Sequence, residues 1–171
     1  SISWLNKQDN IHTVLVVFRL NVYFWGSQVN TYPDLGDEVS SEEREQLWAN
    51  YHNIILALKN GGKKVVIIQP IPEPRQRIGD LIYSEGKLNK SISATKSEWW
   101  DKRNEYSLKK LSALPKDIQQ FNSTPVFCDN HHCYAVKALQ SYYYDHNHLS
   151  SLGADLLAKE FIHWYGSLHT P

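Results

Sequence analysis

Two strand-length runs of aliphatic residues, separated by one strong helix signal, constrain the fold of this chain most. The first run is "HTVLVVFRL" at residues 12–20, and the second, "KKVVIIQPIPEP" at residues 63–74, ends in prolines that cannot continue a ladder. Neither run alternates polar and apolar residues, which is typical of strands buried on both faces. Between them, Ser40 and Glu43 form a capping box that opens a helix ending near Gly61. Strand, helix and strand predict a βαβ unit with a mostly parallel sheet.

The remaining segments are predicted from their residue patterns. Residues 21–39 are predicted to form an aromatic-rich loop, and residues 75–96 a long surface loop. "SEWWDKRNEYSLKKLSAL" begins with Ser97 as a cap and predicts a helix, whereas "STPVFCD" at residues 123–129 predicts a short last strand. A final helix is expected from about Ser150 to Tyr165.

Length and charge exclude several classes of protein. The chain has 171 residues, 42% of them hydrophobic, so it can bury one core, and a single domain over residues 1–171 is expected. Its 18 basic and 18 acidic residues give no reason to expect nucleic acid or an anionic membrane surface as a partner. The longest apolar run, "TVLVVF", is far shorter than the roughly 20 residues that span a bilayer.

The carboxyl ends of the predicted strands indicate where a site should lie. In open α/β sheets, ligands bind beyond these ends. The residues there are Arg19 to Phe24, Gln69 to Pro74, and the loop that leads to Asp145 and His148.

The pair Asp145 and His148 has two readings. A histidine acts as a general base on a hydroxyl when a carboxylate accepts its other N–H and so fixes its tautomer. The spacing of three residues lets Asp145 turn back onto the ring. Alternatively, Asp145 caps a turn and His148 is a half-exposed loop residue.

The stretch "YYYDHNHLSSLGADLLA" resembles the last sequence block of the SGNH/GDSL hydrolase superfamily, in which Asp-x-x-His supplies acid and base. Its form "D-x-x-H-L-S-x-x-G-A" is similar to that of one subgroup, the SGNH-like domain fused to bacterial membrane O-acyltransferases of the acyltransferase-3 family. "VLVVFRLNVYFWG", "KKVVIIQPIPEP" and "FCDNHHC" resemble further blocks of that subgroup in the same order. The resemblance spans residues 14 to 161.

This resemblance implies a three-layer α/β/α sandwich with a mostly parallel, flavodoxin-like sheet. It implies His148 as general base, Asp145 as its orienting carboxylate, and Asn21 or Arg19 as donor to an oxyanion. The alternatives are a salt bridge at a strand end for Arg19 and a loop turn for Asn21. The extracytoplasmic compartment that the resemblance implies, with the closeness of the two cysteines, predicts a disulfide between Cys128 and Cys133.

One family feature has no counterpart in the sequence. The superfamily's nucleophile is the serine of a Gly-Asp-Ser block, whereas Gly79 and Asp80 are followed by Leu81. With no methionine at its start, the chain is expected to be an N-terminally incomplete domain whose first strand and serine lie upstream; the alternative is a divergent member of the superfamily without that nucleophile. Without that serine we expect no acyl-enzyme and no activity of the chain alone, so its being an enzyme stays open.

The whole protein is expected to move an acyl group, in the first place acetyl, onto a hydroxyl of a cell-surface polysaccharide such as lipopolysaccharide. A membrane acyltransferase domain would deliver the acyl donor, the domain would be periplasmic and tethered to the inner membrane, and no cofactor is expected. A secreted GDSL-type carbohydrate esterase is the first alternative.

Two further alternatives come from composition. A non-catalytic carbohydrate-binding module would stack sugar rings on aromatic side chains, for which the candidates are Trp25, Tyr32, Trp99 and Trp100. A metal site would draw on the potential ligands Cys128, His131, His132, Cys133, His146 and His148. Cys-x4-Cys with the His pair inside the loop is not a usual zinc spacing, so no metal is expected.

Overall fold

The structure is a computed structural model and describes residues 2–26, 32–36, 38–84 and 91–168. The chain forms two compact units, each built from three separated segments. The first unit comprises Ser1–Ser27, Asp37–Pro70 and Asn104–Asn122. The second unit comprises Gln28–Gly36, Ile71–Arg103 and Ser123–Pro171.

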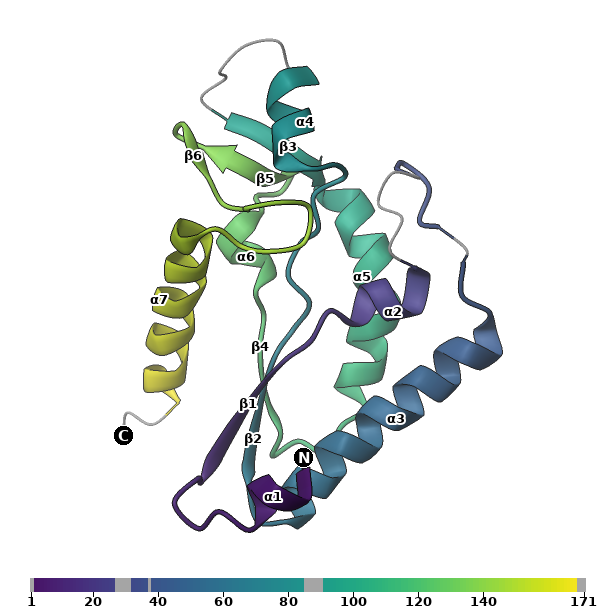
Figure 1. The fold of residues 1–171 in the computed structure, drawn as a ribbon, viewed down its shortest axis with the longest axis vertical. Helices are drawn as coiled ribbons and strands as arrows, with labels where there is room; N and C mark the ends of the chain where they lie inside the picture. The colour runs from purple at the N-terminus through teal and green to yellow at the C-terminus, as the bar shows by residue number, and fades with distance from the viewer. Residues whose placement is uncertain (1, 27–31, 37, 85–90, 169–171) are drawn as a thin grey trace. The chain divides into compact units, whose positions relative to one another are not determined.

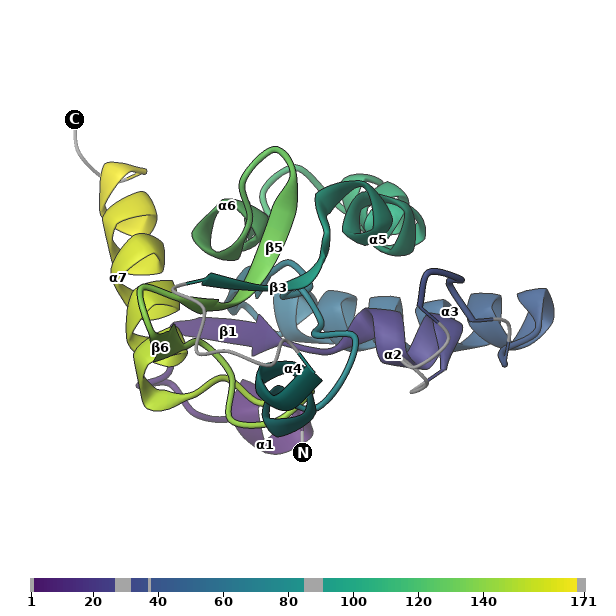
Figure 2. The same cartoon turned by 90° about the horizontal axis from the view of Figure 1, so that it is seen from above.

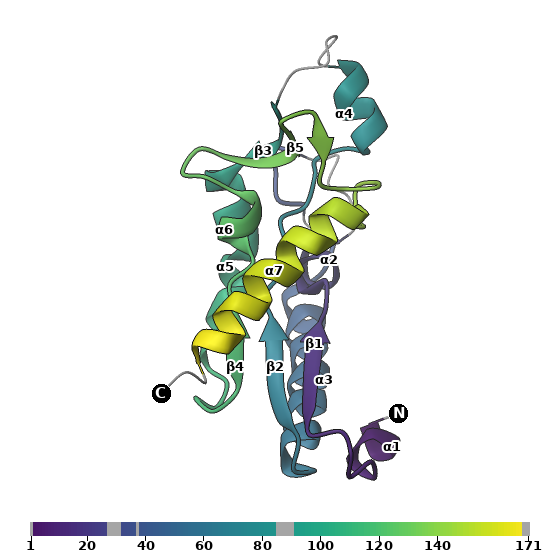
Figure 3. The ribbon, with the colours of Figure 1, turned by 90° about the vertical axis from the view of Figure 1, so that its left-hand side faces the viewer.

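A parallel sheet forms the centre of the first unit. Its strands are β1 (Thr13–Val17), β2 (Lys64–Ile68) and β4 (Gln119–Phe121), in the order β1-β2-β4. Both pairings are parallel, with Leu15 opposite Val66 and Ile68 opposite Phe121. Figure 3 shows the three strands side by side. The predicted α/β class with a mostly parallel sheet is therefore confirmed.

Helices cover one face of this sheet. They are α1 (Ile2–Asn6), α2 (Leu20–Trp25), α3 (Ser41–Asn60) and the C-terminal part of α5 (Ser97–Ser112), all labelled in Figure 1. Their apolar residues enclose the β2 side chains in a core made of Leu20, Phe24, Tyr51, Ile55, Leu58, Val65, Ile67, Leu111, Leu114 and Ile118. As predicted, Ser40 caps α3, because its side chain accepts a hydrogen bond from the Glu43 N–H at 3.1 Å.

The prediction that both strands are buried on both faces is confirmed for β2 and is wrong for β1. Residues 65–68 of β2 are all buried, whereas Leu15 and Val17 of β1 are 44% and 52% exposed. Within the described sheet, β1 pairs with β2 alone, and only Val14 and Val16 on its other face pack against the core. An aliphatic run therefore indicated a strand here without indicating its place at the sheet edge.

The second unit contains an antiparallel sheet that the sequence did not predict. Its strands are β3 (Ser91–Lys96), β5 (His132–Lys137) and β6 (Gln140–Ser141), in the order β3-β5-β6. To this unit belong the N-terminal part of α5 and the helices α4 (Ile78–Ser84), α6 (Thr124–Phe127) and α7 (Ser151–Ser167), which are labelled in Figure 2. Its main core consists of Ile78, Leu81, Ile92, Ala94, Ala135, Val136 and Tyr143.

Three sequence predictions are corrected by these elements. The supposed surface loop of residues 75–96 contains α4 and β3, because a few apolar side chains such as Leu81 and Ile92 are enough to bury them. The expected strand "STPVFCD" contains helix α6, since Pro125 suits a first helical turn. The expected aromatic loop begins with helix α2. Among the helices of the described residues, none is long and apolar enough to cross a membrane.

Candidate active site

The candidate site lies in the second unit, on residues 142–150, which we call the site loop. The loop closes on itself, since Tyr143 and Leu149 form an isolated antiparallel bridge and the Tyr144 N–H donates to the His148 carbonyl at 2.8 Å. Its first end is anchored by Tyr143, whose buried hydroxyl donates to the carbonyl of Pro72 at 2.7 Å.

The other end of the site loop is fixed by the start of α7. Ser150 caps the helix, because its hydroxyl oxygen accepts the Gly153 N–H at 3.1 Å and its own O–H donates to the Ser141 carbonyl at 2.6 Å. Gly153 is required here by a close approach, since a Cβ on it would lie 2.1 Å from the Tyr142 carbonyl oxygen. The "L-S-x-x-G" part of the sequence block therefore specifies how the helix joins the loop.

Asp145 binds both the backbone and the ring of the histidine. Its Oδ1 accepts the backbone N–H groups of Asn147 and His148, at 2.5 and 2.7 Å. Its Oδ2 lies 2.8 Å from the His148 Nδ1. The structure thus brings together Asp145 and His148, the two residues that the sequence placed in one acid–base pair.

The electrostatics of the pair suit a general base. Desolvation raises the pKa of Asp145, but the hydrogen bonds from the His148 ring and from two backbone N–H groups outweigh it and lower the pKa below its usual range. An ionised Asp145 keeps the imidazole proton on Nδ1, which leaves the lone pair of Nε2 available. The His148 side chain is 74% exposed, so a hydroxyl group can reach that nitrogen.

A second Asp-x-x-His sequence provides an internal comparison. Asp129 also accepts backbone N–H groups, those of His131 and His132, both at 2.8 Å. Its other oxygen, however, accepts the Tyr134 hydroxyl at 2.6 Å instead of a histidine ring. Both aspartates therefore stabilise a turn, as the simpler reading proposed, and of these two only Asp145 also orients a histidine.

The proposed oxyanion donors lie in the first unit. Arg19 is the residue before α2, and Asn21 lies within that helix. Asn21 is fully buried, donates to Asn104 Oδ1 at 3.2 Å and accepts a short hydrogen bond from the Ser107 hydroxyl. Asn104 and Ser107, spaced along one side of α5, were not singled out from the sequence. The oxyanion roles of Arg19 and Asn21 stay predictions.

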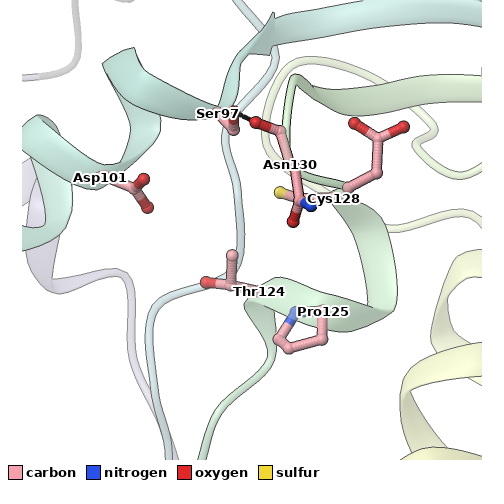
Figure 4. A pocket seen from close by; sticks show the side chains of 7 residues that line it. Ser97, Asp101, Thr124, Pro125, Cys128 and Asn130 are labelled. Atoms are coloured by element: carbon pink, nitrogen blue, oxygen red, sulfur yellow. Dashed lines mark hydrogen bonds between the residues drawn. The ribbon is translucent and has the colours of Figure 1, made fainter.

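The predicted disulfide is confirmed, with an S–S distance of 2.05 Å between Cys128 and Cys133. Beside it lies a pocket of about 340 Å³ (Figure 4), where the Ser97 hydroxyl at the start of α5 donates to the Asn130 carbonyl at 2.9 Å. Asp101 and Thr124 also line this pocket. In the part of the chain that the structure describes, no three His, Cys, Asp or Glu side chains lie close enough to hold a metal ion.

A buried ion pair next to the site loop was missed by the sequence reasoning. Arg103 Nε and Glu73 Oε2 are 2.5 Å apart, with side chains only 1% and 6% exposed. Arg103 also donates to the Leu35 carbonyl at 2.8 Å. Burial, together with the charge of Glu73, raises the pKa of Tyr143, which keeps its hydroxyl protonated as a donor to Pro72. The sequence signal was weak: one acidic residue among prolines, and one arginine among other helix charges.

The parallel sheet of the first unit and the contact between Asp145 and His148 in the second are each consistent with the SGNH-type domain that the sequence resembles. The family model for the SGNH domain fused to AT3 domains matches residues 1–163. The chain belongs to this family and is an acyltransferase-associated SGNH domain. No curated protein and no solved structure matches the chain.

Proposed function

We propose that Asp145 and His148 form the acid–base pair of an O-acyl transfer reaction. The observation that carries the proposal is the 2.8 Å contact between Asp145 Oδ2 and His148 Nδ1, in a histidine whose side chain is largely exposed. His148 would accept the proton of an attacking hydroxyl, and Asp145 would stabilise the imidazolium that results.

The proposed reaction consists of two successive acyl transfers, first to a serine and then to a sugar hydroxyl. In the first, a serine oxygen attacks the acyl carbonyl carbon, His148 takes the serine proton and returns it to the leaving group, and an acyl-enzyme remains. In the second, a sugar hydroxyl gives its proton to His148, attacks the acyl carbon and releases the serine, which regains the proton. By the family pattern, Asn21 or Arg19 would donate hydrogen bonds to the oxyanion of each intermediate.

The serine is expected, by the same resemblance, in a Gly-Asp-Ser block of the parent protein, because these 171 residues contain no such block. The description of the family as fused to AT3 domains supports a membrane acyltransferase as the source of the acyl donor. The disulfide supports an oxidising, extracytoplasmic compartment. We propose acetyl as the acyl group and a cell-surface polysaccharide as its acceptor.

The test measures acetyl transfer to polysaccharide, and release of acetate, by the full-length parent protein and by its His148→Ala variant. His132→Ala is the matched control, because this residue follows the comparison Asp-x-x-His spacing but its ring is not held by Asp129. We expect loss of turnover in His148→Ala alone. Full activity of His148→Ala, or an equal loss in both variants, would contradict the proposal.

Hydrolysis is the second candidate function. The 74% exposure of the His148 side chain lets water reach the base as readily as a sugar hydroxyl would. Acetate release that does not depend on added polysaccharide, and is lost in His148→Ala, would identify the domain as a carbohydrate esterase instead of a transferase.

A further inference from the structure

A second pocket of the second unit, of about 370 Å³, lies between residues 32–35 and the first turn of α5. Its wall is apolar and aromatic. The ring centroids of Tyr32 and Trp99 are 5.3 Å apart with a tilt of 60°. Trp99 is 6% exposed and its indole N–H donates to the Asp34 carbonyl at 3.4 Å, so its ring is held against Tyr32. The half-buried Tyr32 ring, which has the Arg75 guanidinium 5.9 Å from its centroid, presents its remaining surface to a ligand.

The rim of this pocket carries an excess of positive charge. Lys96, Glu98 and Lys102 line it, and all three are exposed. Lys102 lies 3.1 Å from Glu98, but an ion pair of two exposed side chains gives little stabilisation and is easily rearranged. Two ammonium groups against one carboxylate favour an anionic ligand.

We propose that this pocket binds an acidic sugar residue of the polysaccharide acceptor, that is, a pyranose ring with a carboxylate. The apolar C–H face of the ring would lie on Tyr32, and the carboxylate would accept charge-assisted hydrogen bonds from Lys96 and Lys102. Pockets of a few hundred Å³ are of the size that holds small ligands. The inference deepens the proposed function, because it names the class of acceptor that the acyl transfer would use.

The pocket and the site loop share one buried support. The carbonyl of Leu35, in the pocket wall, accepts a hydrogen bond from Arg103, and Arg103 forms an ion pair with Glu73. The carbonyl of the neighbouring Pro72 accepts a hydrogen bond from the hydroxyl of Tyr143, which lies two residues before Asp145. A bound sugar would therefore contact a wall that is held by Arg103, whose partner Glu73 is next in sequence to the anchor of the site loop, Pro72.

The experiment measures binding of tri-galacturonic acid, and of its methyl ester, to the 171-residue chain by isothermal titration. The ester retains the rings and removes the negative charges. We expect the acid to bind several-fold more tightly than the ester, and inorganic phosphate to compete only weakly, because it offers no ring to Tyr32. Equal affinity for the acid and the ester, or no binding of either ligand, would overturn the proposal.

Variants locate the binding site. In Lys96→Gln/Lys102→Gln we expect affinity for the acid to fall by about fivefold, the effect of two exposed ion pairs. The ester should be unaffected by this change, whereas Tyr32→Ala should weaken both ligands. The matched control is Lys109→Gln/Lys159→Gln, in which two exposed lysines outside the pocket lose the same charge. An equal loss of affinity in the control would show that only the total charge of the chain matters, and would overturn the assignment of the binding site.

The catalytic variant separates this inference from the proposed function. His148→Ala should bind the acid as well as the unchanged chain does. If full-length His148→Ala retains activity while the lysine variant loses binding, the proposed function fails and the pocket stands. If His148→Ala loses activity but the lysine variant binds normally, the pocket assignment fails and the proposed function stands.

Discussion

Asp145 is a single side chain on which both the shape and the chemistry of the site depend. One oxygen holds the turn by accepting two backbone N–H groups, and the other holds the imidazole. Asp129 makes the same turn without holding a ring. A substitution that preserves the turn can therefore separate the two roles.

We expect Asp145→Asn to keep the turn and lose the activity of the full-length protein. An amide oxygen can still accept the backbone N–H groups, but the amide NH₂ would face His148 Nδ1 and force the ring proton onto Nε2, where the base is needed. The expected fall in kcat is about a hundredfold or more. Asp129→Asn is the matched control and should leave kcat unchanged, and a similar fall in both variants would contradict the assignment.

The lowered pKa of Asp145 predicts a pH-dependent contribution to stability. Because folding lowers this pKa, the ionised form stabilises the folded state above the ordinary carboxyl pKa of about 4, and the contribution is lost as the pH falls towards the lowered value. In urea unfolding, Asp145→Asn should be less stable than the unchanged chain at pH 7. The difference should shrink at pH 3, and a constant difference would show that the charge plays no part.

Contacts between residues that are close along the chain could be predicted from the sequence. Asp145 and His148 are three residues apart, so their pairing could be predicted from one loop. The partners of Tyr143 and Arg103 lie 71 and 30 residues away, and no local pattern reveals such contacts. Cys128 and Cys133 were predictable for the same reason as the acid–base pair.

At the level of elements, α7 determines the geometry of the site loop. The helix starts at a capped serine, and its third residue is a glycine in contact with the loop backbone. The predicted limits of this helix were close to those observed, because its cap and apolar pattern are local. Short elements such as α4 and α6 were missed, since tertiary burial and not local pattern stabilises them.

Gly153→Ala should destabilise the chain by about 1–3 kcal/mol and lower activity, because the new methyl group meets the Tyr142 carbonyl at 2.1 Å and must displace the site loop. Gly166→Ala in the same helix meets no atom within 4 Å and should be stabilising by about 0.5–1 kcal/mol. Thermal unfolding of both variants provides the check. A stable, active Gly153→Ala would show that the close contact is not needed.

At the scale of the whole molecule, the two units differ in how they are stabilised. The first contains a parallel sheet covered by helices, as the βαβ pattern predicted. The second combines a small antiparallel sheet with a disulfide and a buried ion pair, features that its sequence revealed only in part. The family match at residues 1–163 runs through segments of both.

The buried pair of the second unit predicts a non-additive response to mutation. Arg103→Met should lower the unfolding free energy by about 3–5 kcal/mol, because it leaves the Glu73 charge buried without its partner. Glu73→Gln/Arg103→Met removes both charges and should recover part of this loss. A double-mutant cycle by urea unfolding gives the coupling, and strictly additive losses would mean that the pair contributes no interaction of its own.

The interleaved path of the chain has a consequence for synthesis. A chain leaving the ribosome exposes the last segment of the first unit, Asn104–Asn122, before it exposes any of Ser123–Pro171. The parallel sheet can therefore close before the site loop has left the ribosome, and domains generally fold as their segments emerge. The site loop and α7 are then the last parts of these 171 residues to be assembled, so a ribosome stalled once Asn122 has emerged would display the segments of the first unit while Asp145 and His148 are still inside its exit tunnel.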